Sequence, residues 1–162
     1  MRKGYSFTQI ALHWAVLLLL IPQFFLHDAI AHAWREVMRG GTPDADPLIA
    51  QHVVVGILLL ALVLWRILLR VTRGAPEQPA EEPPLLRFAA RAAHGLLYLL
   101  LLLIPVSGLA AWFGGVETAA FVHETMFNLL VLIVILHVGG ALYHQFVLKT
   151  NLLDRMRKPE RP

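Results

Sequence analysis

Four long apolar stretches, separated by short polar connections, make up most of this chain of 162 residues. They cover residues 7–26, 48–70, 88–113 and 121–148, each near or above the roughly 20 residues that a membrane-spanning helix needs. The stretches are continuous and rich in leucine, alanine and valine, without the alternation of a half-buried strand. The pattern therefore predicts an all-α membrane protein: a bundle of four transmembrane helices forming a single domain over residues 1–162.

The connections between the four stretches differ in composition. Residues 27–47 include the run Gly-Gly-Thr-Pro-Asp-Ala-Asp-Pro and are predicted to form a polar loop. Residues 71–87 contain four prolines, which predicts a stiff surface linker, and residues 114–120 are predicted to form a very short hairpin loop. Pro22 and Pro105 fall inside the first and third helices, where we expect kinks that a membrane helix tolerates.

Composition agrees with a membrane location and narrows the chemistry. Hydrophobic residues make up 57% of the chain and charged residues only 15%, a balance unlike that of a soluble globule. Cysteine is absent, which excludes disulfides, thiolate-bound iron–sulfur clusters and covalent attachment of a c-type haem. The net charge of +3 comes from basic residues beside helix ends, so it indicates orientation in a membrane and no nucleic acid.

The positions of lysine and arginine predict which ends of the helices face the cytoplasm. With four spans, only Arg35 and Arg39 fall on one side. This asymmetry predicts that both termini are cytoplasmic. An alternative is that Arg2, Lys3 and the following apolar run form a cleavable signal peptide, whose removal would leave three spans. The residues on the basic side are Arg2, Lys3, Arg70, Arg73, Arg87, Arg91, Lys149, Arg155, Arg157, Lys158 and Arg161.

Histidines inside the predicted spans are the main indication of chemistry. His13, His52, His123 and His137 lie in or at the ends of apolar stretches, where an unbound titratable side chain costs free energy. Histidine is a common axial ligand of haem iron. Fourteen residues separate His123 from His137, which places them on nearly one face of a helix and about 21 Å apart along its axis. This spacing predicts two haems stacked across the membrane.

Depth in the predicted bundle pairs these histidines. His52 and His123 lie at the outer ends of their helices and can share one iron, whereas His13 and His137 lie deeper towards the cytoplasm and can share a second. Any single histidine of this kind can instead hydrogen-bond to a neighbouring helix. Glycines one turn from His52 and next to His137 leave room for a flat ring, although glycines also serve close helix packing: Gly56, Gly139 and Gly140.

Because of other polar residues, the identity of the two histidines that ligate the inner haem stays open. His94 and His144 also lie towards the inner side, and either can replace His13 or His137, or hydrogen-bond a quinone or a haem propionate. Arg66, a turn inside the second span, matches a propionate carboxylate in geometry, or it extends its charge to the cytoplasmic interface.

Two further histidines fall at the predicted outer loop. His27 and His32, with Asp28 and Glu36 nearby, have a spacing that can bind a metal ion but is also typical of a solvated loop. No catalytic residue is predicted.

Short motifs along the chain resemble those of the bacterial cytochrome b561 family. Tyr-Ser-Phe-Thr-Gln-Ile-Ala-Leu-His-Trp at residues 5–14 resembles the family's N-terminal motif, in which a glutamine precedes a His-Trp pair by four residues. Ala-His-Gly-Leu-Leu-Tyr at 93–98 and Ile-Pro-Val-Ser-Gly at 104–108 resemble its third helix. Three further motifs resemble the family's fourth helix: His-Glu-Thr at 123–125, Leu-His at 136–137 and Ala-Leu-Tyr-His at 141–144.

The resemblance implies a four-helix bundle with two b-type haems, one ligated by His52 and His123 and the other by His13 and His137. Related cytochrome b subunits of formate dehydrogenases and hydrogenases have the same fourteen-residue ligand spacing, which supports His137 over His144. The resemblance also implies electron transfer to or from the quinone pool of the bacterial inner membrane. For a small stand-alone member, it implies a superoxide oxidase, which passes electrons from superoxide to ubiquinone.

The expected partners follow from this interpretation: the lipid bilayer, ubiquinone or another quinone, and superoxide or a protein electron donor. One alternative is a haem b membrane-anchor subunit of a larger dehydrogenase or hydrogenase. Another is a haem-free bundle whose histidines handle protons or metal ions. The predicted outer loops carry six acidic residues against Arg35 and Arg39, which is an unfavourable field for an anion such as superoxide.

Overall fold

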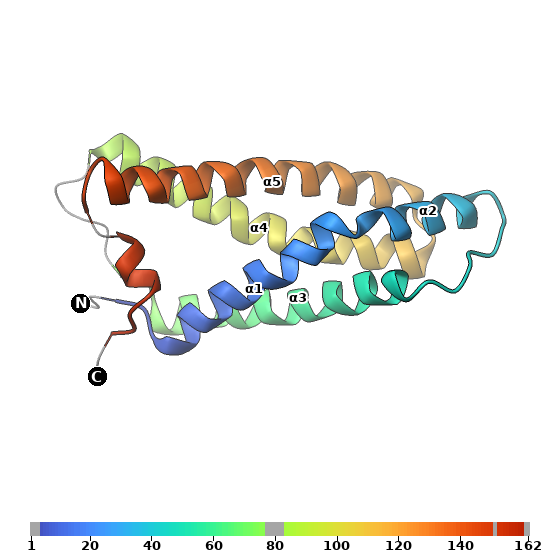
Figure 1. Ribbon diagram of the computed structural model, residues 1–162, viewed down its shortest axis with the longest axis horizontal. Helices are drawn as coiled ribbons and strands as arrows, with labels where there is room; N and C mark the ends of the chain where they lie inside the picture. The colour runs from blue at the N-terminus through green and yellow to red at the C-terminus, as the bar shows by residue number, and fades with distance from the viewer. Residues whose placement is uncertain (1–3, 77–82, 151, 161–162) are drawn as a thin grey trace.

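Four long helices run side by side in the computed structural model, which describes residues 4–76, 83–150 and 152–160. The long helices are α1 (Phe7–Phe25), α3 (Pro47–Arg73), α4 (Pro84–Gly114) and α5 (Glu117–Phe146). Each is long and apolar enough to cross a membrane, so the predicted all-α fold with four membrane-spanning helices is confirmed (Figure 1). A shorter helix, α2 (His27–Met38), continues from α1, and a 3-10 turn, η1 (Leu152–Met156), follows α5.

The two ends of the bundle are made by different parts of the chain. Both termini lie at one end, here called the terminal end, and α2 lies with the α4–α5 connection at the other, here called the α2 end (Figure 1). Helix α4 packs along α5 and α3, and α1 packs along α3. Helix α2 covers the α2 end by packing against α3 and α1.

Local signals in the sequence account for two of the helix starts. Ser6 and Gln9 form a capping box at the start of α1: Gln9 N donates to Ser6 Oγ at 3.3 Å and Ser6 N donates to Gln9 Oε1 at 3.0 Å. Asp46 caps α3 by accepting from Leu48 N at 2.8 Å, with Pro47 in the first helical position. These caps satisfy backbone donors that the helices themselves leave free.

The prediction of a loop over residues 27–47 is wrong for its first part, because residues 27–38 form α2. The turn-rich run that suggested a loop begins only at Gly40, whose φ of +78° lies in the left-handed region. Helix α2 is polar on one face and buries Ala33 on the other, with Asp28 in its first turn and Arg35 in its last, an arrangement that suits the helix dipole.

The two other connections are shorter than predicted. Helix α4 begins at Pro84 rather than at residue 88, because proline fits the first position of a helix, where no hydrogen bond is lost. Pro79, part of the predicted linker, lies outside the described residues. Only Gly115 and Val116 join α4 to α5, and Gly115 makes this turn possible with a left-handed φ of +66°. Pro22 lies inside α1 and Pro105 inside α4.

The apolar core lies midway along the bundle. One cluster joins α1 to α3 and a second joins α4 to α5, and Leu20 and Leu101 pack against both. These layers separate the histidines at the α2 end from those at the terminal end. The buried members are Val16, Leu59 and Val63 in the first cluster and Leu100, Ile104 and Leu130 in the second.

Hydrogen bonds tie the C-terminal segment to the start of the bundle. The indole Nε1 of Trp14 donates to Met156 O at 2.9 Å, and Glu160 N donates to Tyr5 O at 3.0 Å. The segment after η1 is therefore held across the terminal end, next to the helix turn that carries His13.

Candidate functional site: two histidine pairs

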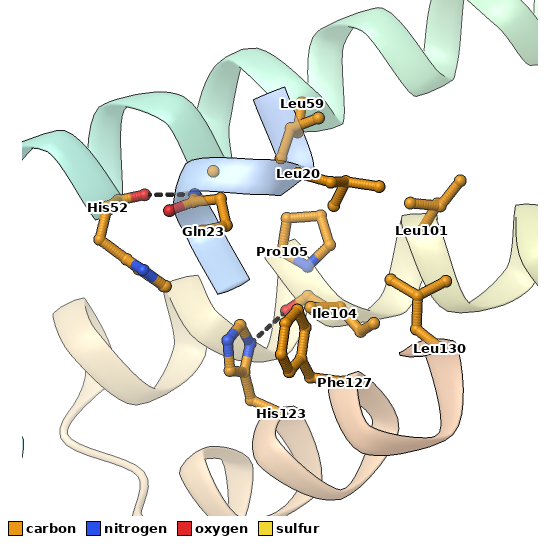
Figure 2. A pocket seen from close by; sticks show the side chains of 11 residues that line it. Leu20, Gln23, His52, Leu59, Leu101, Ile104, Pro105, His123, Phe127 and Leu130 are labelled. Carbon is orange, nitrogen blue, oxygen red and sulfur yellow. Dashed lines mark hydrogen bonds between the residues drawn. The ribbon is translucent and has the colours of Figure 1, made fainter. Parts of the chain in front are cut away.

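One pair of histidines lies at the α2 end, between α3 and α5. The ring centroids of His52 and His123 are 6.2 Å apart, with an angle of 63° between the ring planes. Figure 2 shows the two side chains reaching into the same space from opposite sides. The structure thus brings together the two histidines that were predicted to pair at the outer side.

His123 is oriented by α4. Its Nδ1 lies 2.7 Å from the carbonyl oxygen of Ile104, and because a carbonyl only accepts, Nδ1 carries the proton and Nε2 has a free lone pair (Figure 2). Gly108 lies one turn further along α4, and a Cβ atom built there would be 2.9 Å from Nδ1 of His123. The absence of a side chain at Gly108 is therefore what lets this ring lie against α4.

His52 is held by α1 through its backbone. Gln23, a buried residue of α1, donates from Nε2 to the carbonyl oxygen of His52 at 2.9 Å (Figure 2). The Nδ1 atom of His52 and the Oε1 atom of Gln23 are both buried without a hydrogen-bond partner. Unpaired buried polar atoms are rare because each costs free energy, so two together at one site point to a functional demand.

A cavity of about 470 Å³ opens beside this pair at the α2 end. This volume lies within the range of about 300–1,000 Å³ that is usual for cofactor and small-ligand pockets. Trp34 and Trp112 line it from α2 and α4, and ionisable side chains also border it: His27, Asp28, Arg35, Glu117 and Glu124. A smaller, almost wholly apolar cavity of about 50 Å³ lies between the pair and the core, where Leu101 and Leu130, to the right of the pair in Figure 2, help to line it.

The second pair lies near the terminal end, between α1 and α5. The ring centroids of His13 and His137 are 6.4 Å apart with a 63° angle between planes, nearly the same geometry as in the first pair. A third imidazole, that of His94, lies closer to His137, at 5.1 Å and 76°. The Nδ1 of His94 donates to the carbonyl oxygen of Ala90 at 2.7 Å, within its own helix.

Arginine and tyrosine side chains border this second pair. Nη2 of Arg66 lies 3.4 Å from Nδ1 of His13, and its guanidinium is 5.7 Å from the ring centre of Tyr98. Arg70 approaches the same tyrosine ring at 5.4 Å. The Nε and Nη1 atoms of Arg66 are buried without a hydrogen-bond partner. Burial raises the pKa of the Tyr5 hydroxyl above its usual value, although Arg70 opposes this.

The remaining predicted residues lie elsewhere. His144 shares a hydrogen bond of 3.2 Å with Thr150 beyond the end of α5, so His94 is the imidazole that lies against His137. His27 contacts Asp28 at 3.4 Å, and within the described part of the chain no group of three or more metal-ligating side chains gathers. Gly139 and Gly140, predicted to make room for a ring, have open space beside them.

Sequence reasoning did not find Gln23, Gly108 or Trp34. Gly108 ends the Ile-Pro-Val-Ser-Gly motif, whose first residue accepts from His123, so the motif did carry a signal. A glutamine in the apolar run of α1 was a second signal, since a buried amide needs partners. The place of Trp34 beside the cavity could be predicted only if residues 27–38 had been recognised as a helix.

Comparisons with known proteins identify the family. The model of the prokaryotic cytochrome b561 family matches residues 4–159. Cytochrome b562 of Cereibacter sphaeroides is 38% identical over 159 residues, covering 96% of each chain. A probable superoxide oxidase of Yersinia pestis is 30% identical, with 99% of each chain covered. Cytochrome b561 homolog 1 of Escherichia coli is 29% identical, covering 94% of this chain and 96% of its own.

The chain therefore belongs to the prokaryotic cytochrome b561 family. It is a multi-pass bacterial membrane protein of the cytochrome b type, and membership of this family implies b-type haem and an oxidoreductase role in electron transport.

Proposed function

We propose that this chain carries electrons across the bacterial inner membrane by means of two b-type haems. His52 and His123 ligate one at the α2 end, and His13 and His137 ligate the other near the terminal end. The α2 end faces outwards and both termini face the cytoplasm, as the distribution of lysine and arginine predicts. The observation that carries the proposal is the matching separation of the two histidine pairs.

The separation agrees with ligation of one iron by two imidazoles. A metal–nitrogen bond is about 2.0 Å and the nitrogen lies about 1.1 Å from its ring centroid, so two axial imidazoles have centroids about 6.2 Å apart. The separations are 6.2 Å for His52 and His123 and 6.4 Å for His13 and His137. The 5.1 Å between His94 and His137 is too short for this arrangement, which favours His13 as the partner of His137.

The surroundings of the α2-end pair also fit a haem. The hydrogen bond from His123 Nδ1 to Ile104 leaves Nε2 free to bind iron, and such a bond to the second nitrogen is usual for a metal-bound histidine. The cavity beside the pair is of suitable size and largely apolar, and His52 retains a buried Nδ1 without a partner. When bound, each haem supplies one-electron oxidation and reduction at its iron.

Arg66 supports a haem near the terminal end. A guanidinium only donates, so its contact with His13 Nδ1 makes that nitrogen the acceptor, whereas ligation through Nε2 requires Nδ1 to carry the proton. Arg66 must therefore turn away from His13 when iron is bound. A haem propionate is an anion that can receive it, because guanidinium and carboxylate match in a bidentate geometry.

The electron acceptor we propose is ubiquinone or a related quinone, bound near His94 and Tyr98 at the cytoplasmic side. Oxidation of superoxide to dioxygen releases one electron, and reduction of a quinone to a quinol takes up two electrons and two protons. Two superoxide ions are therefore consumed for each quinol formed. The relative from Yersinia pestis, named a probable superoxide oxidase, supports this assignment over the full chain length.

A second candidate function follows from the charges around the larger cavity at the α2 end. Asp28, Glu117 and Glu124 border it against a single arginine, Arg35, so the local field repels an anion such as superoxide. This observation favours a protein electron donor, as expected if the chain is the haem b membrane-anchor subunit of a larger dehydrogenase or hydrogenase.

Alanine variants of the histidines test the ligand assignment. His52→Ala and His123→Ala should each lose the same haem, and His13→Ala and His137→Ala should each lose the other, as counted by extracted haem per chain and by redox titration. His144→Ala is the control and should retain both haems. The assignment is wrong if any of the four variants keeps both haems, or if His94→Ala loses one outright.

A further inference from the structure

Among the described residues of α1, Gln23 is the buried polar one, and its side chain faces the histidines of the α2 end. Its side chain is only 6% exposed and lies in the last turns of α1, within an otherwise apolar run. It lines both cavities beside the pair formed by His52 and His123. A primary amide in such a place costs free energy unless its donor and acceptor are both used.

The orientation of this amide is determined by its one hydrogen bond. The group that faces the His52 carbonyl must be the donor, because a carbonyl oxygen only accepts, so Nε2 is the atom 2.9 Å away. The acceptor Oε1 is consequently turned to the other side. In Figure 2 it lies on the side of the His52 imidazole, and it is buried with no donor.

His52 has the complementary deficiency. Its Nδ1 is buried and has no hydrogen-bond partner, whereas Nδ1 of His123 already donates to Ile104. If Nε2 of His52 binds iron, Nδ1 must carry the proton and needs an acceptor. Besides the two histidines, Gln23 is the polar side chain that lines both cavities, and its buried Oε1 is an acceptor without a donor.

We propose that Gln23 is the positioning residue of the outer haem ligand: its Oε1 accepts the Nδ1–H of His52 when Nε2 of that imidazole binds iron. The Nε2 donor meanwhile anchors the backbone of the same residue to α1. One amide thus holds both the helix turn and the imidazole of His52. A Cβ atom at Gly56 would lie 3.7 Å from Gln23 Nε2, an ordinary van der Waals contact, so the approach of Gln23 to α3 does not require a glycine there. This inference rests on the proposed ligation by His52.

The role predicts a change in the midpoint potential of the outer haem. An acceptor on Nδ1 makes the imidazole a stronger electron donor, which stabilises the oxidised iron and lowers the potential. Gln23→Leu removes the acceptor, so the potential of the outer haem should rise while that of the inner haem stays unchanged. Gln23→Glu keeps an acceptor oxygen in the same volume, so the potential should remain at or below the wild-type value.

A matched control is available on the adjacent residue. Gln51 precedes His52 in the same helix turn, and its amide is also buried and unpaired, but it makes no hydrogen bond to His52. Gln51→Leu should leave the outer potential where it is. This separates the specific acceptor from a general effect of replacing a buried amide beside His52.

The experiment is a redox titration of the purified holoprotein, with both haems resolved, for the wild type and the three variants. An upward shift confined to the outer haem of Gln23→Leu supports the proposal, as does loss of that haem in Gln23→Leu with retention in Gln23→Glu. An unchanged potential in Gln23→Leu, a shift of the same sign in the Leu and Glu variants, or an equal shift in Gln51→Leu overturns it. A wild-type protein without an outer haem would instead overturn the ligand assignment.

Discussion

Replacing Gly108 with alanine should weaken the binding of the outer haem, although alanine is the better helix former. A Cβ atom at this position would lie 2.9 Å from Nδ1 and 3.0 Å from Cε1 of His123. Non-bonded carbon atoms prefer separations of about 3.5–4.0 Å, so the ring must retreat by about 0.6 Å or more. The substitution therefore acts directly on the imidazole of His123.

The retreat acts on the hydrogen bond that orients His123. The distance from Nδ1 to Ile104 O is 2.7 Å, and lengthening by about 0.6 Å takes it past the usual limit of about 3.2 Å. Leaving a buried donor unpaired costs about 1–3 kcal/mol, against a helix-propensity gain of about 1 kcal/mol for replacing glycine by alanine. Loss of a hydrogen bond that orients a metal-bound histidine lowers metal affinity by about 10–100-fold. We expect an effect of this size on the affinity for the haem at the α2 end.

The assay is the transfer of haem to excess apomyoglobin from purified protein, followed separately for the two haems. The control is Gly95→Ala, on the same helix, where a Cβ atom would have no neighbour within 4 Å. It should leave the outer haem as tightly bound as in the wild type. If Gly108→Ala held its outer haem as tightly as Gly95→Ala, the close approach of His123 to α4 would have no role in ligation.

Two further variants probe the terminal end. Trp14→Phe removes the hydrogen bond to Met156 O, worth about 1 kcal/mol, so tryptic cleavage in the C-terminal segment should become several-fold faster; Trp65→Phe is the control, and equal rates in both would contradict this. Arg66→Gln should lower the affinity for the inner haem about tenfold, because a charge-assisted hydrogen bond is lost, whereas Arg70→Gln should leave this affinity unchanged. Equal haem retention in these two would mean that Arg66 only extends its charge to the interface.

The long helices could be predicted because their signal is local. Continuous apolar runs of spanning length identify α1, α3, α4 and α5, and the fourteen-residue spacing of His123 and His137 follows from helix geometry alone. Helix α2 was missed because it is amphipathic and polar on one face, so that hydropathy treats it like a loop. The pairing partners at the α2 end could be predicted from depth, since α3 and α5 each carry one histidine at that end.

The supporting residues could not be predicted because their roles depend on contacts between helices. Gly108 matters through its distance to a ring on α5, and Gln23 through a carbonyl on α3. Depth also failed to separate His13 from His94, since both lie at the level of His137. The distances of 6.4 Å and 5.1 Å to His137 distinguish them, and these require the packed bundle.

The haem content of the purified wild-type protein tests the central claim most directly. Haem extracted and counted per polypeptide, together with a dithionite-reduced minus oxidised spectrum, should give two low-spin b haems per chain. Two haems are expected because two histidine pairs have the spacing of axial ligands on one iron. A single haem per chain, in protein produced with ample haem, would contradict the account by leaving one of the pairs without an iron to share.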